Sequence, residues 1–126
     1  MKKIIYTDAA PKPIGPYSQA VEANGFIFIS GQIAIDPSTG NMINGDVKTE
    51  AEQVMKNLQA IITAAGGEMN HVVKCTIFLI DMKDFAEVNM IYGKYFTADP
   101  PARETVAVSD LPKNAKVEIS AIVAVK

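Results

Sequence analysis

Hydrophobic and polar residues follow two distinct periods along this chain, and together they predict a series of strands and two helices. A short apolar segment, Ile4–Tyr6, precedes a loop from Ala9 to Tyr17 that contains three prolines. Because proline and glycine interrupt regular structure, this loop is expected to be irregular. The apolar stretches Phe26–Ser30 and Gln32–Ile35 then predict two strands that are joined or kinked at Gly31.

Two segments repeat their apolar residues every three or four positions, which is the period of an amphipathic helix. The first spans Val47–Ala65, with Thr49 and Glu52 as a candidate capping box and Gly66-Gly67 as the expected helix end. The second is expected from about Asp84 to Phe96. Its inner stripe comprises Phe85, Val88, Tyr92, Tyr95 and Phe96.

Three later segments complete the pattern. Val72–Ile80 is continuously apolar apart from Lys74 and Thr76, which predicts a strand buried on both faces. Thr105–Ser109 and Val117–Val125 predict two further strands separated by a turn. The order β-β-β-α-β-α-β-β is typical of an α+β domain with two helices on one face of a mixed sheet. We expect one domain that spans residues 1–126.

The second face of this sheet has no predicted element to cover it. The strands Phe26–Ser30, Val72–Ile80 and Val117–Val125 are apolar at both alternating sets of positions. That amount of apolar surface is too large for a face open to water. Self-association is therefore predicted, and a closed ring of subunits would create clefts between chains, where ligands often bind.

Charge and targeting features exclude several classes of partner. The formal net charge is -2 and the 12 Lys and Arg residues are dispersed, so no basic field favours nucleic acid. The apolar stretch after the first lysines is too short for a signal peptide or a membrane span. A lone cysteine, Cys75, agrees with a reducing compartment. We expect a cytoplasmic protein that binds neither nucleic acid nor membrane.

The scarcity of reactive residues excludes most familiar catalytic sites. Arg103 is the only arginine and His71 the only histidine. Zinc sites and nucleophilic triads need more Cys and His than the chain contains. Neither a G-x-G-x-x-G motif nor a P-loop is present. We expect no metal and no cofactor, with His71 at the surface and Cys75 in the core.

Two charged residues are candidates for chemistry. Arg103 lies just before an apolar strand, and its guanidinium offers paired donors that match a carboxylate. Its alternative interpretation is a structural ion pair or a solvated strand end. Glu118 is the one carboxylate of an otherwise apolar or small-residue strand, where partial burial would suit it to accept a proton from water. Its alternative is an outward-facing strand residue.

Four other residues are candidates for lining a ligand pocket: Tyr17, Ser30, Gly31 and Asn89. Asn89 lies on the apolar side of the second helix, where a buried amide that ties down backbone is the alternative. Tyr17 ends a rigid loop and could instead belong to the core. Ser30 and Gly31 would offer a hydroxyl and a close approach to backbone, although a simple β-bulge is also consistent with the sequence.

Four segments resemble the RidA family of reactive-intermediate deaminases, also called the YjgF family. They are IGPYSQA at 14–20, FISGQIAIDPSTG at 28–40, FAEVNMIY at 85–92 and PPARETVAVSDLPKNAKVEISAIVA at 100–124. The similarity runs nearly end to end, with the segments in the family's order. It implies a chorismate-mutase-like fold and a homotrimer, with the sheets packed into a central barrel and three ligand clefts between adjacent subunits.

The resemblance also implies roles for individual residues. Arg103 would bind the substrate carboxylate, and Glu118 would position or deprotonate the attacking water. Residues expected to bind substrate alongside Arg103 are Tyr17, Ser30, Gly31, Asn89 and Thr105. Two positions depart from the common pattern, because Thr105 replaces a frequent cysteine and Ser120 replaces a frequent glutamate. If position 105 contributes a backbone group to substrate binding, the change to threonine should be mild.

The implied activity is that of a 2-iminobutanoate/2-iminopropanoate deaminase. Such an enzyme hydrolyses the enamine and imine products of pyridoxal-phosphate dehydratases to 2-oxo acids and ammonia. An iminium carbon is already electrophilic, so orientation and one assisted proton transfer are sufficient. The alternatives are a non-enzymatic module that binds small carboxylates, a ribonuclease or translation inhibitor, and a holdase-like chaperone.

Overall fold

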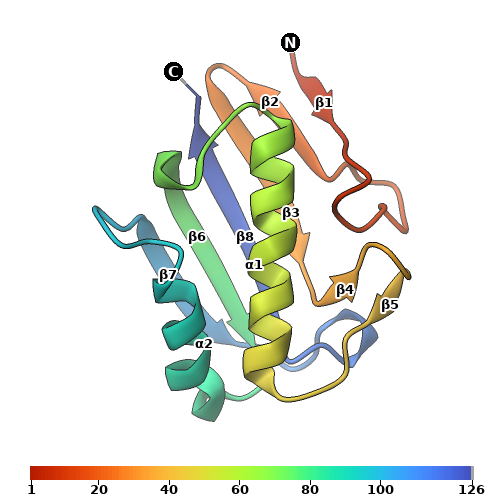
Figure 1. Ribbon diagram of the computed structural model, residues 1–126, viewed down its shortest axis with the longest axis vertical. Coiled ribbons are helices and arrows are strands. Elements are labelled where there is room, and N and C mark those ends of the chain that lie inside the picture. Colours follow the sequence, from red (N-terminus) through yellow and green to blue (C-terminus); the bar gives the residue numbers. More distant parts are fainter. Residues whose placement is uncertain (126) are drawn as a thin grey trace.

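The fold is built on a six-stranded mixed sheet with both helices against one of its faces (Figure 1). The computed structural model describes residues 1–125. In spatial order the strands are β1 (Lys3–Ile5), β2 (Ala20–Ala23), β3 (Phe26–Gln32), β8 (Val117–Ala124), β6 (Val72–Leu79) and β7 (Ala102–Ala107). Only β6 and β7 are parallel; the other neighbours are antiparallel. The predicted α+β class, with a mixed sheet and two helices on one face, is confirmed.

The first helix, α1 (Val47–Ala64), packs on β3 and β8 at the centre of the sheet. Its N-cap is Asp46, whose carboxylate accepts hydrogen bonds from the Thr49 N–H at 2.9 Å and the Thr49 hydroxyl at 2.8 Å. These hydrogen bonds lower the pKa of Asp46. The predicted capping box of Thr49 and Glu52 is therefore wrong, because the helix begins two residues before Thr49.

The glycine pair after α1 ends the helix as predicted. Gly66 has φ +82°, a left-handed conformation that glycine adopts without a steric penalty. The Gly67 N–H donates to the Ile62 carbonyl at 2.9 Å, which satisfies one of the last helical acceptors. The chain then passes through a short 3-10 turn, Met69–His71, into β6.

The second helix, α2 (Phe85–Gly93), is shorter than predicted. It follows a 3-10 turn at Met82–Asp84 and lies beside α1 (Figure 1). Tyr95 and Phe96 lie beyond its end but still pack against the core, which is why the apolar periodicity extended through them. Neither helix in the described part of the chain is long and apolar enough to cross a membrane.

The observed strands differ from the predicted ones most in the region of β3. β3 runs through Gly31 to Gln32, with a register shift against β8 between Ile29 and Gln32. The predicted strand Gln32–Ile35 is therefore wrong, because Gln32 belongs to β3 and Ile33 and Ala34 lie in no strand. Ile35–Asp36 (β4) pairs with Asn41–Met42 (β5) in a separate ribbon. β2 has no counterpart among the predicted strands. β7 begins at Ala102, three residues before the predicted start. A 3-10 turn, Pro112–Asn114, precedes β8.

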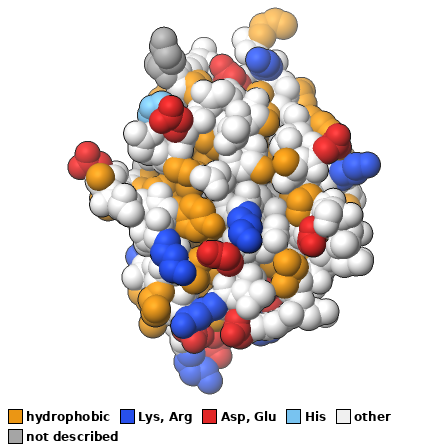
Figure 2. All heavy atoms as spheres, in the orientation of Figure 1, with side chains coloured by type: hydrophobic (Ala, Val, Ile, Leu, Met, Phe, Trp, Pro, Cys, Tyr) orange, Lys and Arg blue, Asp and Glu red, His pale blue; other side chains and the backbone are white. Residues whose placement is uncertain are grey.

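Alternation along the strands separates a closed face from an open face of the sheet. The closed face packs its buried apolar side chains against the helices, as at Ile27, Ile77 and Ile119. On the open face, Phe26 and Phe28 remain 41% and 44% exposed. No element formed by residues 1–125 covers this face, as expected from the sequence. On the helix-bearing side, acidic and basic side chains are interspersed (Figure 2).

Candidate functional site

The two charged candidates lie on opposite faces of the sheet. Arg103 on β7 pairs with Cys75 on β6, a buried residue of the closed face. Glu118 on β8 pairs with Phe78 on β6. Because residues 75 and 78 are an odd number of positions apart, their side chains point to opposite sides of the sheet. A single chain therefore does not bring Arg103 and Glu118 into one site.

Arg103 is held against α2 by two aromatic rings and one amide. Its guanidinium carbon lies 5.3 Å from the Phe85 ring centroid and 5.1 Å from that of Tyr92. Its Nη1 donates to the Asn89 side-chain oxygen at 2.6 Å. Within residues 1–125 no carboxylate pairs with Arg103, so the structural ion pair considered from the sequence is not observed. The remaining guanidinium N–H groups can donate hydrogen bonds to an anionic ligand.

A cleft of about 390 Å³ lies beside Arg103. Its lining comprises Asn89, Tyr92, Gly93, Phe96, Pro100, Pro101 and Arg103. Asn89 is exposed and contacts Arg103, rather than tying down backbone from a buried position. Thr105 is absent from the lining, and its hydroxyl oxygen is buried without a hydrogen-bond partner in residues 1–125. The structure thus brings Asn89 to Arg103 but encloses the Thr105 hydroxyl.

Cys75 lies behind this cluster and is buried, as predicted. Burial raises the pKa of the Cys75 thiol and also the pKa of the neighbouring Tyr92 hydroxyl. Both groups are therefore neutral at physiological pH. His71 is exposed at the start of β6, also as predicted. The only permanent charge in this cluster is that of Arg103.

Glu118 faces a second, larger cavity of about 470 Å³. The structure brings Tyr17, Ser30 and Gly31 together with Glu118 along its wall. The remaining lining residues come from loops and strand ends and were not predicted: Pro11, Lys12, Ile14, Gln19, Gln32, Ile33, Ile35 and Pro112. No local sequence signal indicates that these segments meet, because their contacts span the chain. We call this space the Glu118 cavity.

Gly31 is required for the position of the Glu118 carboxylate. A Cβ atom built at Gly31 would lie 2.7 Å from the Glu118 Cδ, closer than real side chains approach one another. The constraint is thus a close approach between β3 and a side chain of β8. The neighbouring Ser30 hydroxyl donates to the Ser18 carbonyl at 2.6 Å, which leaves the hydroxyl committed to the protein.

The environment of Glu118 favours the uncharged form of its carboxyl group. The side chain is half-buried, and this burial raises its pKa. No hydrogen bond or ion pair to its carboxylate is found within residues 1–125. A carboxylate with a raised pKa and no protein donor is suited to accept a proton from a bound water.

Tyr17 forms a half-exposed edge of the same cavity. Its side chain is 49% exposed, so it is not the core residue that the sequence also allowed. Its hydroxyl oxygen accepts a hydrogen bond from the Ile14 N–H at 3.3 Å, which braces the proline-rich loop. Among residues 1–125, no group of three or more His, Cys, Asp or Glu side chains is placed to hold a metal ion.

The sequence is similar to characterised proteins along nearly its full length. A profile of the family described as endoribonuclease L-PSP matches residues 7–125. A mouse protein named 2-iminobutanoate/2-iminopropanoate deaminase is 50% identical over 122 residues, which cover 97% of this chain and 90% of the mouse protein.

Solved structures share the fold closely. A Rid-family protein from Yersinia pestis superposes with a TM-score of 0.97 at 45% identity, covering 99% of this chain and 100% of that one. E. coli TdcF, solved with bound serine, gives a TM-score of 0.94 at 41% identity, covering 98% of this chain and 99% of the TdcF chain.

Proposed function

Since the chain belongs to the RidA family, within the broader endoribonuclease L-PSP family, we propose that it is a 2-iminobutanoate/2-iminopropanoate deaminase. It hydrolyses the reactive enamine and imine products of pyridoxal-phosphate dehydratases to 2-oxo acids and ammonia. It needs neither a metal nor a cofactor for this reaction. The relative from mouse carries the same activity in its name, and TdcF was solved with a small amino acid bound.

One observation carries this proposal: a guanidinium suited to bind an acid and a carboxylate suited to accept a proton lie on opposite faces of one sheet. The Arg103 half offers a fixed cation with free donors. The Glu118 half offers a carboxylate with a raised pKa in a cavity large enough for a small molecule. In an assembly, the Arg103 half of one copy could meet the Glu118 half of another copy and complete a site.

The assembly that we propose is a homotrimer with sites between adjacent subunits. The open sheet face supports self-association because Phe26, Phe28 and Val106 stay exposed there in a single chain. A closed ring pairs each face with a different surface of its neighbour. Each interface then joins the Arg103 cluster of one subunit to the Glu118 cavity of the next.

The reaction follows from the chemistry of these groups. Arg103 pairs with the substrate carboxylate and so fixes the iminium carbon near the neighbouring Glu118. Water adds to that carbon while Glu118 accepts a proton from the water. The resulting carbinolamine takes that proton back on its nitrogen. Ammonia then leaves as the carbonyl forms, and the hydroxyl proton passes to Glu118, which returns it to solvent. The net change is one imine and one water converted into one 2-oxo acid and one ammonia.

Binding without catalysis is the first alternative function. A module that senses small carboxylates would need Arg103 but would not need Glu118. Ribonuclease activity is the second, and the family description favours it. The dispersed basic residues and the single exposed histidine provide little of what RNA cleavage requires. Cytoplasmic location stays a prediction, with which the free Cys75 agrees.

Mixing two inactive variants tests the shared site directly. Arg103→Ala and Glu118→Gln should each abolish the acceleration of 2-oxobutanoate release when threonine dehydratase supplies the imine. If they are unfolded together and refolded as a mixture, random assembly restores about a quarter of the sites, because each intact half comes from a different chain. Activity near that fraction supports the proposal.

Three other results would count against it. Activity in Glu118→Gln alone points to a role without the proposed base. No restoration in a mixture that assembles normally contradicts a site shared between copies. If the wild-type protein fails to accelerate the reaction but binds 2-oxobutanoate, the binding module replaces the enzyme. An RNA cleavage assay on the same preparations checks the family description.

A further inference from the structure

The buried polar side chains are concentrated around one part of the molecule. Among residues 1–125, four polar or charged residues are buried: Gln19, Gln32, Glu50 and Asn57. Burying such groups lowers stability unless hydrogen bonds compensate, and apolar residues would fill a core at lower cost. Each of the four contacts backbone in a segment that encloses the Glu118 cavity, or precedes Glu118 itself.

Gln19 connects the N-terminal loop to the end of β3. Its Nε2 donates to the carbonyl oxygens of Thr7 and Pro11, both at 2.9 Å, and its Oε1 accepts from the Thr7 N–H at 2.7 Å. Its own carbonyl accepts from the Ser30 N–H at 2.9 Å. Pro11 and Ser30 both line the Glu118 cavity. Gln19 therefore contacts two walls, the N-terminal loop through its side chain and the end of β3 through its backbone carbonyl.

Asn57 fixes another wall from outside the cavity. It lies on α1, and its Nδ2 donates to the carbonyl oxygens of Ile33 at 3.2 Å and Ile35 at 3.0 Å. Its Oδ1 accepts from the Gln53 Nε2 at 2.8 Å, which fixes the orientation of the amide. Ile33 and Ile35 line the cavity, whereas Asn57 does not. Asn57 can therefore affect the cavity only through these backbone segments.

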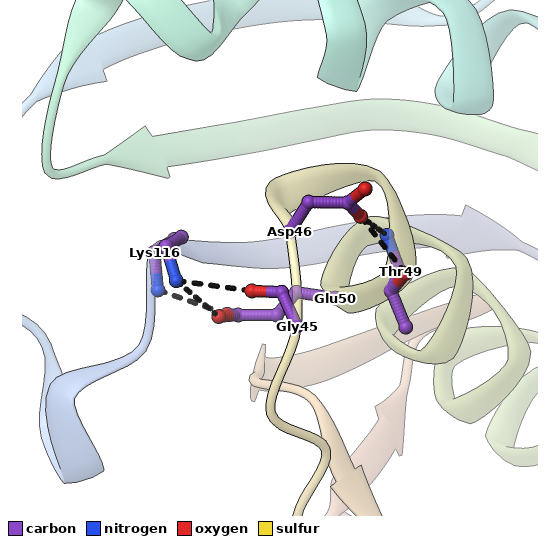
Figure 3. Close-up of polar contacts among 5 residues, drawn as sticks. All are labelled: Gly45, Asp46, Thr49, Glu50 and Lys116. Carbon is purple, nitrogen blue, oxygen red and sulfur yellow. Dashed lines mark hydrogen bonds and ion pairs between the residues drawn. The ribbon is translucent and has the colours of Figure 1, made fainter.

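Gln32 and Glu50 hold the two strands that meet at the Glu118 carboxylate, β3 with Gly31 and β8 with Glu118 itself. The Gln32 Nε2 donates to the Ser30 carbonyl at 3.0 Å, beside Gly31. Glu50 at the start of α1 accepts a hydrogen bond from the Lys116 N–H at 2.9 Å and pairs with the Lys116 Nζ at 3.6 Å (Figure 3). Lys116 precedes Glu118 by two residues, so Glu50 fixes the entry of β8.

We propose that Gln19, Gln32, Glu50 and Asn57 are positioning residues that hold the walls of the cavity rigidly around the Glu118 carboxylate. This inference rests on the proposed function, in which Glu118 accepts the proton from water. A reacting group works best when the residues around it are themselves locked by hydrogen bonds, because less reorganisation is needed during the reaction. The four residues supply this support at buried positions where apolar side chains would fill the core at lower cost in stability.

Loosening these walls should change the solvation of Glu118. The other titratable side chains that line its cavity are Lys12 and Tyr17, both exposed and both on the N-terminal loop. Burial is what raises the pKa of Glu118. When a wall moves, water reaches the carboxylate and its pKa falls toward that of a free glutamate. Lost stability elsewhere in the core has no such effect.

The test compares Asn57→Leu with Val54→Ala in the assembled protein. Leucine keeps the branched shape of asparagine and its number of heavy atoms but lacks its donors, and Val54 is a fully buried α1 residue that does not line the cavity. Both variants should lower the unfolding temperature. Titration of the Glu118 carboxyl carbon by NMR, without substrate, should show a lowered pKa in Asn57→Leu and an unchanged one in Val54→Ala.

The kinetic comparison uses the same two variants at a temperature well below both unfolding midpoints. We expect kcat for imine hydrolysis to fall about tenfold or more in Asn57→Leu, because displacement of a reacting group is costly. Binding of 2-oxobutanoate, which Arg103 anchors, should change by less than about twofold. Val54→Ala should retain both values. If Asn57→Leu does not fold, Gln19→Met replaces it as a variant that removes donors at similar volume.

The outcomes separate this inference from the proposed function. Identical Glu118 titrations in Asn57→Leu and Val54→Ala overturn the positioning role, whatever the activity. Equal losses of kcat in the two variants also overturn it. If the wild-type protein is inactive but the titrations differ as expected, the walls do control Glu118, and the proposed reaction is what fails.

Discussion

The two halves of the candidate site hold their charged groups in opposite ways. Arg103 lies on an edge strand, exposed, and two aromatic rings and one amide support it. Glu118 lies on a central strand, half-buried, in a cavity whose walls are tied by hydrogen bonds from buried side chains. The edge of the sheet presents the arginine, and the interior of the fold encloses the glutamate.

This contrast follows from what each charge must do. A guanidinium stays protonated in any environment, so it needs orientation but no special solvation. A carboxylate that is to accept and return a proton near neutral pH needs a raised pKa, which requires partial removal from water. The fold therefore places more hydrogen bonds from buried side chains around the Glu118 carboxylate than around the permanently charged Arg103 guanidinium.

Glu118→Gln should give the largest loss of activity. The amide keeps the shape of the side chain but cannot accept the proton from water. General-base catalysis contributes about 10²–10⁴-fold, and kcat should fall by that order. Because Arg103 is unchanged, 2-oxobutanoate should still bind with nearly the wild-type affinity in calorimetry. A parallel loss of binding would mean that Glu118 holds the ligand rather than the water.

Arg103 substitutions should act mainly on binding. Arg103→Ala removes the anchor, and we expect kcat/KM to fall about 10²-fold or more, with a matching loss of 2-oxobutanoate affinity. Arg103→Lys keeps the charge but loses the planar pair of donors, so it should recover only part of the activity. The unfolding temperature should change little because the side chain is exposed. Unchanged binding in Arg103→Ala would remove this residue from the site.

The sequence predicted the long elements of the fold better than the short ones. Both helices have a clear periodicity, and β6 and β8 are long apolar runs rich in β-branched residues. β2 was missed because Ala20–Ala23 is short, contains a glutamate and is defined by pairing on both sides. A local signal did exist, since Asn24-Gly25 has two positive φ angles, 51° and 83°, and asparagine–glycine is typical of a tight hairpin turn.

The site was predicted as a set of residues but not as an arrangement. Scarcity identified Arg103, and an isolated carboxylate in an apolar strand identified Glu118. Their separation onto two faces depends on the strand register, which no pattern in one sequence specifies. The cavity walls likewise depend on contacts such as that between Asn57 and Ile35, 22 positions apart.

Gly31→Ala should disturb only the Glu118 half. The new Cβ would overlap the carboxyl group of Glu118 and displace it from the cavity wall. We expect kcat to fall about ten- to a hundredfold, because small displacements of reacting groups are costly. Gly45→Ala is the matched control, since its Cβ would meet nothing closer than 3.5 Å. If Gly31→Ala retains full activity, the position of Glu118 that we describe does not matter for the reaction.

The smallest effect that we expect is a pH-dependent gain in stability for Glu118→Gln. The folded state raises the pKa of Glu118 above its unfolded value, so the native protein holds this proton more tightly. The stability that the protonated Glu118 contributes is fully present below the pKa of this carboxyl in the unfolded state. It is lost as the pH rises through the pKa of the same carboxyl in the folded state. The wild-type protein therefore bears a stability penalty at neutral pH that the glutamine variant lacks.

Glu118→Gln should unfold a few degrees higher than wild type at pH 7, corresponding to about 1 kcal/mol or less. This difference should shrink as the pH falls toward about 4, where glutamates ordinarily titrate. Arg103→Met provides the contrast, because it removes a permanent charge, and its stability difference from wild type should be the same at both pH values. Paired thermal unfolding curves measure both differences, and a gap for Glu118→Gln that is constant with pH would mean that burial does not control this carboxyl group.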